Sequence, residues 1–179
     1  GAVTPDTEFQ IGGRFVVGGH AITDVDFDPT LTVAGVVKRS SNVGAAKIAL
    51  QLGSDKLYAG LKRFGFGART GIELPGEQIG MLRDPSRWRE IDLAHIAFGY
   101  GLTVTPLQLA AAIATIGNHG MYEEPRIVDQ VSDVDGNVTY RGEGGEHRAV
   151  SEATAAQMMK MLVAVVDKAD MAADSGMTG

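Results

Sequence analysis

The sequence has 179 residues, of which 44% are hydrophobic and 21% are charged, a composition typical of a chain that forms one globular domain. Its net charge of −6 argues against a nucleic-acid partner, because a surface that binds phosphates needs a basic stripe. The absence of cysteine excludes thiol catalysis, disulfides and cysteine-ligated zinc.

The N-terminal segment is predicted to form a loop followed by a β-hairpin. Two short apolar runs, residues 14–17 and 20–23, flank a Gly-Gly pair that favours a tight turn between antiparallel strands. Acidic residues alternate along residues 24–28, as at the start of a calcium-binding loop. That pattern then has Pro29 where glycine is needed and Gly35 where glutamate is needed, so we interpret the stretch as a loop without a metal ion.

Three consecutive helices are predicted next. The first covers residues 29–39 and starts at an Asp-Pro pair, with aspartate as N-cap and proline as the first helical residue. The second covers residues 43–52, carries small residues that favour close helix packing, and ends at Gly53 in a left-handed cap. The third covers residues 54–64, where apolar residues repeat at helical spacing up to another glycine.

The junction between the first two helices has the sequence Ser-Ser-Asn. Ser40 and Asn42 would diverge on a helix, whereas on an extended backbone they point to the same side. A hydroxyl and a carboxamide therefore converge here only if the chain unwinds briefly. The alternative interpretation is helix capping, in which Ser41 or Asn42 simply starts the second helix.

Residues 65–71 are predicted to form a loop that lacks the third glycine of a dinucleotide-binding fingerprint. Within it, residues 69–71 (Arg-Thr-Gly) are similar to a Lys-Thr-Gly motif. Because no strand-like run precedes them, we do not interpret them as a catalytic strand. Residues 72–77 are interpreted as an exposed turn. An Asp-Pro pair at 84–85 then starts a short helix that runs to Trp88.

A compact helix-start signal lies at residues 105–108. Thr105 is expected to be the N-cap, Pro106 the first helical residue and Gln108 the partner in a capping box. The apolar residues that follow, up to Gly117, fall on all sides of the helix, so an interior helix is predicted.

The C-terminal part is predicted to contain a hairpin and a helix. Runs 126–134 and 138–141 flank an Asp-Gly turn signal, and residues 142–145 are interpreted as a flexible turn. Ser151 starts a helix that is expected to run to Ala169 with an apolar stripe in the core. The stripe consists of Met158, Met161, Leu162, Val165 and Val166.

Most familiar catalytic patterns are missing. There is no Gly-x-Ser-x-Gly elbow and no carboxylate pair suited to glycoside chemistry. The four histidines share no metal-ligand spacing, so surface or capping roles are expected for them, and neither a metal nor a cofactor is predicted. These histidines are His20, His95, His119 and His147. The Ser-x-Asn junction remains as the chemical candidate.

Two stretches carry a family resemblance. Residues 40–44 (Ser-Ser-Asn-Val-Gly) and residues 98–110, which run from Phe-Gly-Tyr-Gly to Gln-Leu-Ala, resemble the class B penicillin-binding proteins, in particular the cell-division transpeptidases. The Gly120 turn and the glycines of residues 65–77 agree with that family in order and spacing. The resemblance implies an α+β fold that is mainly α with peripheral β-hairpins. It would be the helical lobe of the transpeptidase fold shared with serine β-lactamases, without most of its sheet.

The resemblance also implies a domain organisation. Residues 1–179 would form one partial transpeptidase domain. Its expected parts are a loop and hairpin at 1–28, a helical core at 29–120, a hairpin region at 121–150, a terminal helix at 151–169 and a loose tail at 170–179.

The implied activity is D,D-transpeptidation. A serine attacks the D-Ala-D-Ala bond of a peptidoglycan stem peptide, an acyl-serine forms, and β-lactams trap the same serine. Ser40 would relay protons near the leaving group, and Asn42 would hold the substrate amide and help to position a lysine. Tyr100, with Gly99 and Gly101, would lie along the substrate cleft.

The sequence departs from the family in one respect: no serine is followed by lysine three residues later, and Lys-Thr-Gly is absent. Acyl transfer needs an activated nucleophile, so residues 1–179 alone are predicted to be inactive. They are expected to be the middle of a longer domain whose missing parts are partners of this lobe, together with stem peptide and β-lactams. Apolar faces left uncovered would favour self-association.

The implied location is the extracytoplasmic face of the bacterial inner membrane. No apolar run approaches the roughly 18 residues of a transmembrane helix, so the membrane anchor is expected outside these residues.

Two alternative functions stay open. One is a non-catalytic helical scaffold or interaction module derived from this lobe. The other is a fragment of a serine β-lactamase or carboxypeptidase. The Thr-Pro-Leu-Gln run at residues 105–108 disfavours it, because that run resembles the cell-division transpeptidases.

Overall fold

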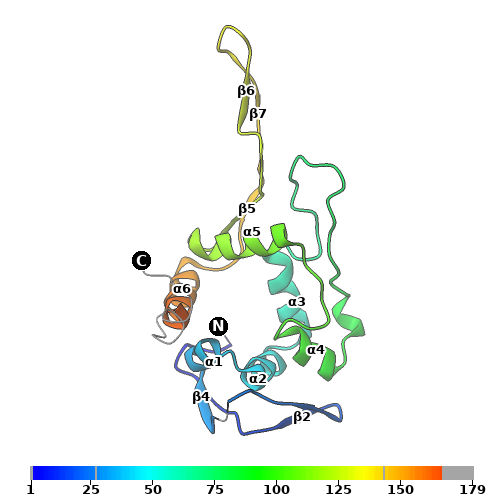
Figure 1. The fold of residues 1–179 in the computed structure, drawn as a ribbon, viewed down its shortest axis with the longest axis vertical. Helices are drawn as coiled ribbons and strands as arrows, with labels where there is room; N and C mark the ends of the chain where they lie inside the picture. Colours follow the sequence, from blue (N-terminus) through cyan, green and yellow to red (C-terminus); the bar gives the residue numbers. More distant parts are fainter. Residues whose placement is uncertain (1, 27, 143, 167–179) are drawn as a thin grey trace. The chain divides into compact units, whose positions relative to one another are not determined.

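The computed structural model describes residues 2–26, 28–142 and 144–166 (Figure 1). These residues form two compact units. The first unit contains the chain up to Tyr58, residues 83–102 and the chain from Ala156, and the second contains residues 59–82 and 103–155. Helices α3 (Ser54–Arg63) and α6 (Glu152–Val166) cross the division between them. The assignment of residues 1–179 to a single partial domain stays a prediction.

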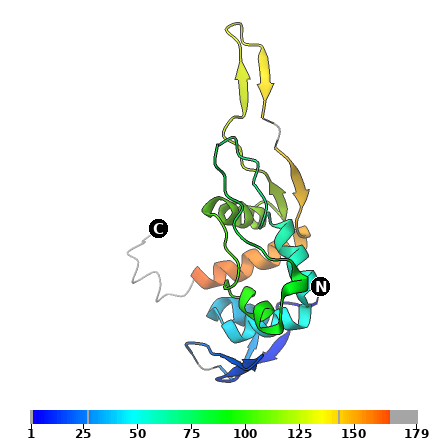
Figure 2. The ribbon, with the colours of Figure 1, turned by 90° about the vertical axis from the view of Figure 1, so that its right-hand side faces the viewer.

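The first unit combines short antiparallel strand pairs with helices. Strand β1 pairs with β4, and β2 pairs with β3. The elements are β1 (Glu8–Gln10), β2 (Phe15–Val17), β3 (His20–Ile22), β4 (Thr30–Thr32), α1 (Val33–Arg39), α2 (Asn42–Leu52), the 3-10 helix η1 (Pro85–Arg87) and α4 (Glu90–Ile96). In the views of Figures 1 and 2 the β2–β3 hairpin runs alongside α2. The predicted hairpin, the second helix and the short helix at residue 85 are therefore confirmed.

The core of the first unit joins the hairpin to two helices. Val17 and Ile22 of the hairpin pack in one cluster with Val43 of α2 and Ile91 of α4. The small residues of α2 also let α1 pack closely against it. A Cβ atom at Gly44 would lie 2.3 Å from Cγ2 of Val36 in α1. The expectation of close helix packing at α2 is confirmed.

Two predictions for the first unit are wrong. The first helix begins at Val33 instead of residue 29, because residues 30–32 pair with residues 8–10 as a strand that local signals did not reveal. β-Branched threonines suit that strand, and the Thr32 hydroxyl replaces Asp28 as the N-cap by accepting from the Gly35 N–H at 3.0 Å. Gly53 caps α2 with φ +87° but ψ 157°, outside the left-handed helical region that was expected.

The second unit is built around α5 (Pro106–Gly117). The predicted capping box is present, since Thr105 Oγ1 accepts from the Gln108 N–H while Gln108 Oε1 accepts from the Thr105 N–H. The prediction of burial on all sides is wrong: Ala111 and Ala112 are buried, but Leu109 is 48% and Ile113 59% exposed. In the described residues of this lobe, one face of the helix has no covering layer.

Four further strands belong to the second unit: β5 (Met121–Glu123), β6 (Gln130–Ser132), β7 (Val138–Arg141) and β8 (Glu146–Arg148). The β6–β7 hairpin was predicted, and Figure 2 shows it as a separate two-stranded ribbon beyond β5 and β8. The β5–β8 pair was missed, because its strands lie 25 residues apart at the pair Tyr122 and His147.

The Arg-Thr-Gly sequence at residues 69–71 has no strand conformation, as predicted. Thr70 is buried, and both its N–H and its hydroxyl donate to Glu77 Oε1 at 2.6 and 2.7 Å. These bonds lower the pKa of the Glu77 carboxyl. The threonine hydroxyl therefore serves the local fold.

Helix α6 starts as predicted, with the Ser151 hydroxyl accepting from the Thr154 N–H at 3.2 Å. Its stripe is only partly buried, and Val166 is 71% exposed, so the interpretation of the whole stripe as core is wrong for the described chain. The rest of the predicted helix, 167–169, and the predicted tail at 170–179 lie outside the described residues.

Candidate active-site junction

The chain unwinds between α1 and α2 at the predicted position. Ser40 has φ 55° and ψ 46°, a left-handed conformation, and Ser41 is extended with φ −73° and ψ 115°. The N–H groups of Ser40 and Ser41 close α1 by donating to Val37 O at 3.2 Å and Val36 O at 3.0 Å. The break is confirmed, but only its middle residue is extended, so a left-handed turn at Ser40 replaces the extended backbone that was expected.

Ser41 is the residue that caps α2. Its hydroxyl oxygen accepts from the Gly44 N–H at 2.9 Å and donates its proton to Asp24 Oδ2 at 2.5 Å. The side chain is buried, with 3% exposure. The capping alternative is therefore correct for Ser41, and it is compatible with a chemical role for the residues on either side.

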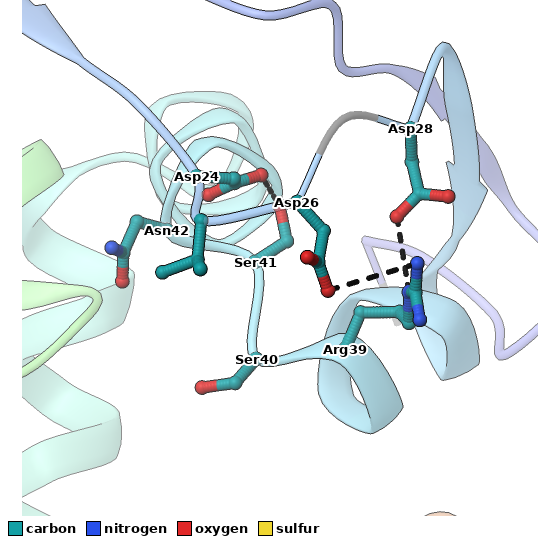
Figure 3. A pocket seen from close by; sticks show the side chains of 8 residues that line it. Asp24, Asp26, Asp28, Arg39, Ser40, Ser41 and Asn42 are labelled. Carbon is teal, nitrogen blue, oxygen red and sulfur yellow. Dashed lines mark hydrogen bonds and ion pairs between the residues drawn. The ribbon is translucent and has the colours of Figure 1, made fainter.

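Ser40 and Asn42 are left available by this arrangement. In Figure 3 both side chains extend to the same side of the loop, whereas Ser41 turns toward Asp24. Ser40 is exposed and Asn42 half-buried, and neither side chain is hydrogen-bonded to another residue in the described parts of the chain. A hydroxyl that can donate and accept and a carboxamide are thus presented on the same side of the junction.

A cavity of about 230 Å³ lies beside Ser40 (Figure 3). Its wall carries three acidic side chains from residues 24–28 and one arginine from residues 39–42. Arg39 Nε lies 3.1 Å from Asp28 Oδ2, and Arg39 Nη2 lies 3.8 Å from Asp26 Oδ2. The hydrogen bond that Arg39 donates to Asp28, together with the negative charge of Asp28, raises the pKa of the Arg39 guanidinium. The cavity is lined by Asp24, Val25, Asp26, Asp28, Arg39, Ser40, Ser41 and Asn42.

A second hollow of about 310 Å³ brings Asn42 together with Tyr100. His95 and Phe98 also line it, and their rings meet edge to face with centroids 5.5 Å apart. The Phe98 and Tyr100 rings are 5.8 Å apart, and Tyr100 is 69% exposed. An exposed aromatic wall beside a carboxamide suits a ligand that has both apolar and amide parts.

The predicted site residues are thus divided between two neighbouring hollows. Asn42 lines both, Ser40 lines the first, and Tyr100 lines the second. Gly99 and Gly101 flank Tyr100 with φ values of +92° and +84°, a backbone conformation that favours glycine. These glycines set the path of the loop that carries the tyrosine.

Within the described residues, no group of three or more His, Cys, Asp or Glu side chains is arranged to hold a metal ion. A search of the same parts of the chain finds no helix with the length and apolarity to cross a membrane.

A family model for the penicillin binding protein transpeptidase domain matches residues 1–178. The chain belongs to the penicillin-binding protein transpeptidase family. The resemblance that the motifs indicated is therefore confirmed.

Two relatives show how much of a transpeptidase this segment represents. Penicillin-binding protein PbpB of Mycolicibacterium smegmatis is 33% identical over 178 residues, which are 98% of this chain and 28% of the relative. Peptidoglycan D,D-transpeptidase FtsI of Escherichia coli is 47% identical over 106 residues, 59% of this chain and 18% of the relative. The chain therefore spans less than a third of these relatives.

Solved structures agree with the fold. Penicillin-binding protein 3 of Mycobacterium tuberculosis in complex with aztreonam matches with a TM-score of 0.86 and 33% identity, over 94% of this chain and 38% of that chain. The apo transpeptidase domain of Burkholderia pseudomallei penicillin-binding protein 3 matches with a TM-score of 0.80 and 35% identity, over 93% and 48%. These matches and the observed elements confirm the α+β transpeptidase fold class.

Sequence reasoning missed three residues of this transpeptidase segment that bond to the junction or line the hollow beside it. Asp24 was assigned to a failed calcium pattern, yet it bonds Ser41 and the Val43 N–H. His95 was assigned a surface or capping role, and Phe98 had no individual role, yet both line the hollow beside Asn42. The acid alternation and the Phe-Gly-Tyr-Gly run were the only local signals for them.

Proposed function

We propose that residues 1–179 form the helical part of a peptidoglycan D,D-transpeptidase that works through an acyl-serine intermediate. The observation that carries the proposal is the unwound junction in which Ser41 caps α2 and leaves the side chains of Ser40 and Asn42 on the same side of the loop, where both line one cavity. Family membership gives this hydroxyl–carboxamide pair a reaction to serve. The nucleophilic serine, its lysine and the Lys-Thr-Gly strand are supplied by polypeptide outside these residues.

In this reaction the nucleophilic serine oxygen attacks the carbonyl of the D-Ala-D-Ala bond, and the leaving D-alanine takes a proton. The Ser40 hydroxyl, which both donates and accepts, passes that proton toward the leaving amine. The Asn42 carboxamide holds the stem-peptide amide by accepting and donating one hydrogen bond each. Tyr100 forms the wall of the hollow on the Asn42 side.

β-Lactams are the second ligand class in this proposal, because they acylate the same serine in place of the donor peptide. One of the matching solved structures contains aztreonam and another contains ampicillin. The proposed location is the extracytoplasmic face of the inner membrane, where peptidoglycan stem peptides are found.

The rest of the transpeptidase domain is the proposed partner of α5. Leu109 and Ile113 expose an apolar face on this helix, and the chain covers only 48% of a solved transpeptidase domain. Residues 1–179 alone are therefore expected to self-associate through uncovered apolar surface. Sedimentation velocity at increasing concentration tests this, and a strictly monomeric profile contradicts it.

Fluorescent penicillin labelling tests the proposed function. The polypeptide that contains this segment and its flanking sequence is expected to label stoichiometrically, and Ser40→Ala and Asn42→Ala are expected to slow labelling by 10²-fold or more. Residues 1–179 alone are expected to take up no label. Covalent labelling of residues 1–179 contradicts the proposal that the nucleophile lies outside them. A flanking sequence without Ser-x-x-Lys and Lys-Thr-Gly contradicts the proposal and favours the scaffold alternative.

A further inference from the structure

Asp24 connects the β2–β3 hairpin to the start of α2. Both of its carboxylate oxygens are used: Oδ2 accepts from Ser41 Oγ at 2.5 Å, and Oδ1 accepts from the Val43 N–H at 3.0 Å. Ser41 Oγ in turn accepts from the Gly44 N–H at 2.9 Å. A negative charge at a helix N-terminus is also favoured by the helix dipole.

These bonds are made by residues next to Ser40 and Asn42, the two side chains of the Ser-x-Asn motif. Ser41 follows Ser40 directly, and Val43 follows Asn42 directly, so the two groups that Asp24 holds are the sequence neighbours of the two motif side chains. Ser40 has a left-handed backbone, which a residue with a Cβ adopts only where its surroundings fix it. Bonds from the Ser40 and Ser41 N–H groups to α1 hold this backbone on one side, and the bond from Ser41 to Asp24 holds the next residue on the other.

We propose that Asp24 is a positioning residue of the transpeptidase site. It holds the α1–α2 junction against the end of the hairpin, so that the Ser40 hydroxyl and the Asn42 carboxamide keep the geometry that acylation requires. The inference rests on the proposed function. A displacement of about 1 Å in a positioned group can slow a reaction roughly 10²-fold, so loss of this carboxylate acts on rate through Ser40 and Asn42.

Asp55 offers a matched control at the start of another helix. It lies in the first turn of α3, is exposed, and lines neither of the two hollows. An Asp→Asn change there removes the same charge from a helix N-terminus and leaves the bonds to Ser41 and Val43 in place.

The test uses the complete transpeptidase that contains this segment and follows acylation by a fluorescent penicillin with time. Asp24→Asn keeps the size of the side chain but replaces one accepting oxygen with a donor. It is expected to lower the acylation rate per active site 10- to 100-fold, while the final labelled fraction stays at the wild-type value. Asp55→Asn is expected to stay within twofold of the wild-type rate.

A double-mutant cycle sharpens the test. Ser41→Ala alone is expected to slow acylation 3- to 10-fold. Combined with Asp24→Asn it should slow acylation by less than the product of the two single effects, because both changes break one chain of bonds. Combined with Asp55→Asn, the effects should multiply.

The outcomes separate a positioning role from a structural one. If Asp24→Asn lowers only the labelled fraction or the melting temperature, with a wild-type rate per labelled site, Asp24 is merely structural and the inference is overturned. If Asp24→Asn does not fold, Ser41→Ala decides, and an unchanged rate overturns the inference. A complete wild-type chain that never labels overturns the proposed function as well, whereas equal rates for wild type and Asp24→Asn overturn this inference alone.

Discussion

Two helix starts in this chain use the same capping chemistry with different results. At α5, Thr105 and Gln108 bond each other's backbone, and Gln108 Nε2 also donates to Ala68 O at 2.7 Å and Ile79 O at 3.0 Å. At α2, Ser41 and Asp24 accept from the first N–H groups, and the side chains of Ser40 and Asn42 are not hydrogen-bonded to another described residue. The first start uses all its polar side chains for the fold, and the second leaves two side chains that the proposed function assigns to a ligand.

The contrast shows how a fold can present reactive groups without losing a cap. Because Asp24 and Ser41 satisfy the first N–H groups of α2, Ser40 and Asn42 are not needed for stability. At the start of α5 no polar side chain is left over in this way, since Gln108 is 1% exposed and both its amide oxygen and its amide nitrogen are hydrogen-bonded. Substitutions at the two starts should therefore separate stability from activity.

The largest effect is expected at Gln108. Gln108→Ala leaves Ala68 O, Ile79 O and the Thr105 N–H without their partner, and unsatisfied buried groups cost roughly 1–3 kcal/mol each. We expect the free energy of unfolding of residues 1–179 to fall by about 3 kcal/mol in urea titrations. The exposed Gln78→Ala should change it by less than about 0.5 kcal/mol. A loss below about 1 kcal/mol at Gln108 would mean that water replaces its partners.

The next effect is expected where α1 meets α2. Gly44→Ala places a methyl group 2.3 Å from Val36 Cγ2, so the helices must separate and unfolding should become easier by about 2 kcal/mol. Gly60→Ala in α3 meets no atom within 4 Å and should stabilise the chain by about 0.5–1 kcal/mol. Thermal or urea unfolding compares the pair, and a neutral Gly44→Ala would place α1 and α2 further apart than described.

Ser40→Gly should separate stability from activity most clearly. Glycine adopts the left-handed conformation at φ 55° without a Cβ clash, so the free energy of unfolding should rise by about 0.5–1 kcal/mol. Thr105→Ala at the other start should lower it by about 1 kcal/mol through loss of the cap. In the complete transpeptidase, Ser40→Gly should nevertheless label slowly with penicillin. Wild-type labelling by this variant would remove Ser40 from the proposed chemistry.

The smallest effect concerns α4, whose start is capped by a carboxylate. Asp92 accepts from the N–H and the Nε of Arg89, both at 3.0 Å, and the hydrogen bond from the Arg89 side chain is the main cause that lowers its pKa to about 2. Since this folded-state pKa lies below the ordinary value of 3.8, the stabilisation is present at neutral pH. It is lost as pH falls from about 5 to about 2.

Asp92→Asn should therefore lower the free energy of unfolding by up to about 1 kcal/mol at pH 7 and by almost nothing near pH 2. Unfolding curves at several pH values measure the difference between the two chains. A difference that stays constant over this range would show that the charge of Asp92 contributes little.

Local sequence signals were correct at three sites where neighbouring residues decide the structure. The turn at Gly18 and Gly19, the Thr105 cap and the Asp135-Gly136 hairpin tip all depend on residues within a few positions of each other. The β1–β4 pair and the β5–β8 pair could not be found in this way, because each strand has three residues and its partner is 20 or more positions away. Short strands carry too little pattern to identify a distant partner.

For this protein, the sequence by itself determined the break after α1, the capping box of α5 and the motifs that indicate the transpeptidase family. Only the tertiary structure decided which of three adjacent polar residues caps α2. That choice depends on Asp24, whose bond to Ser41 joins residues 17 positions apart. Capping propensity is a property of single residues, but the division between a capping hydroxyl and a free one depends on which groups the folded chain brings within hydrogen-bond distance.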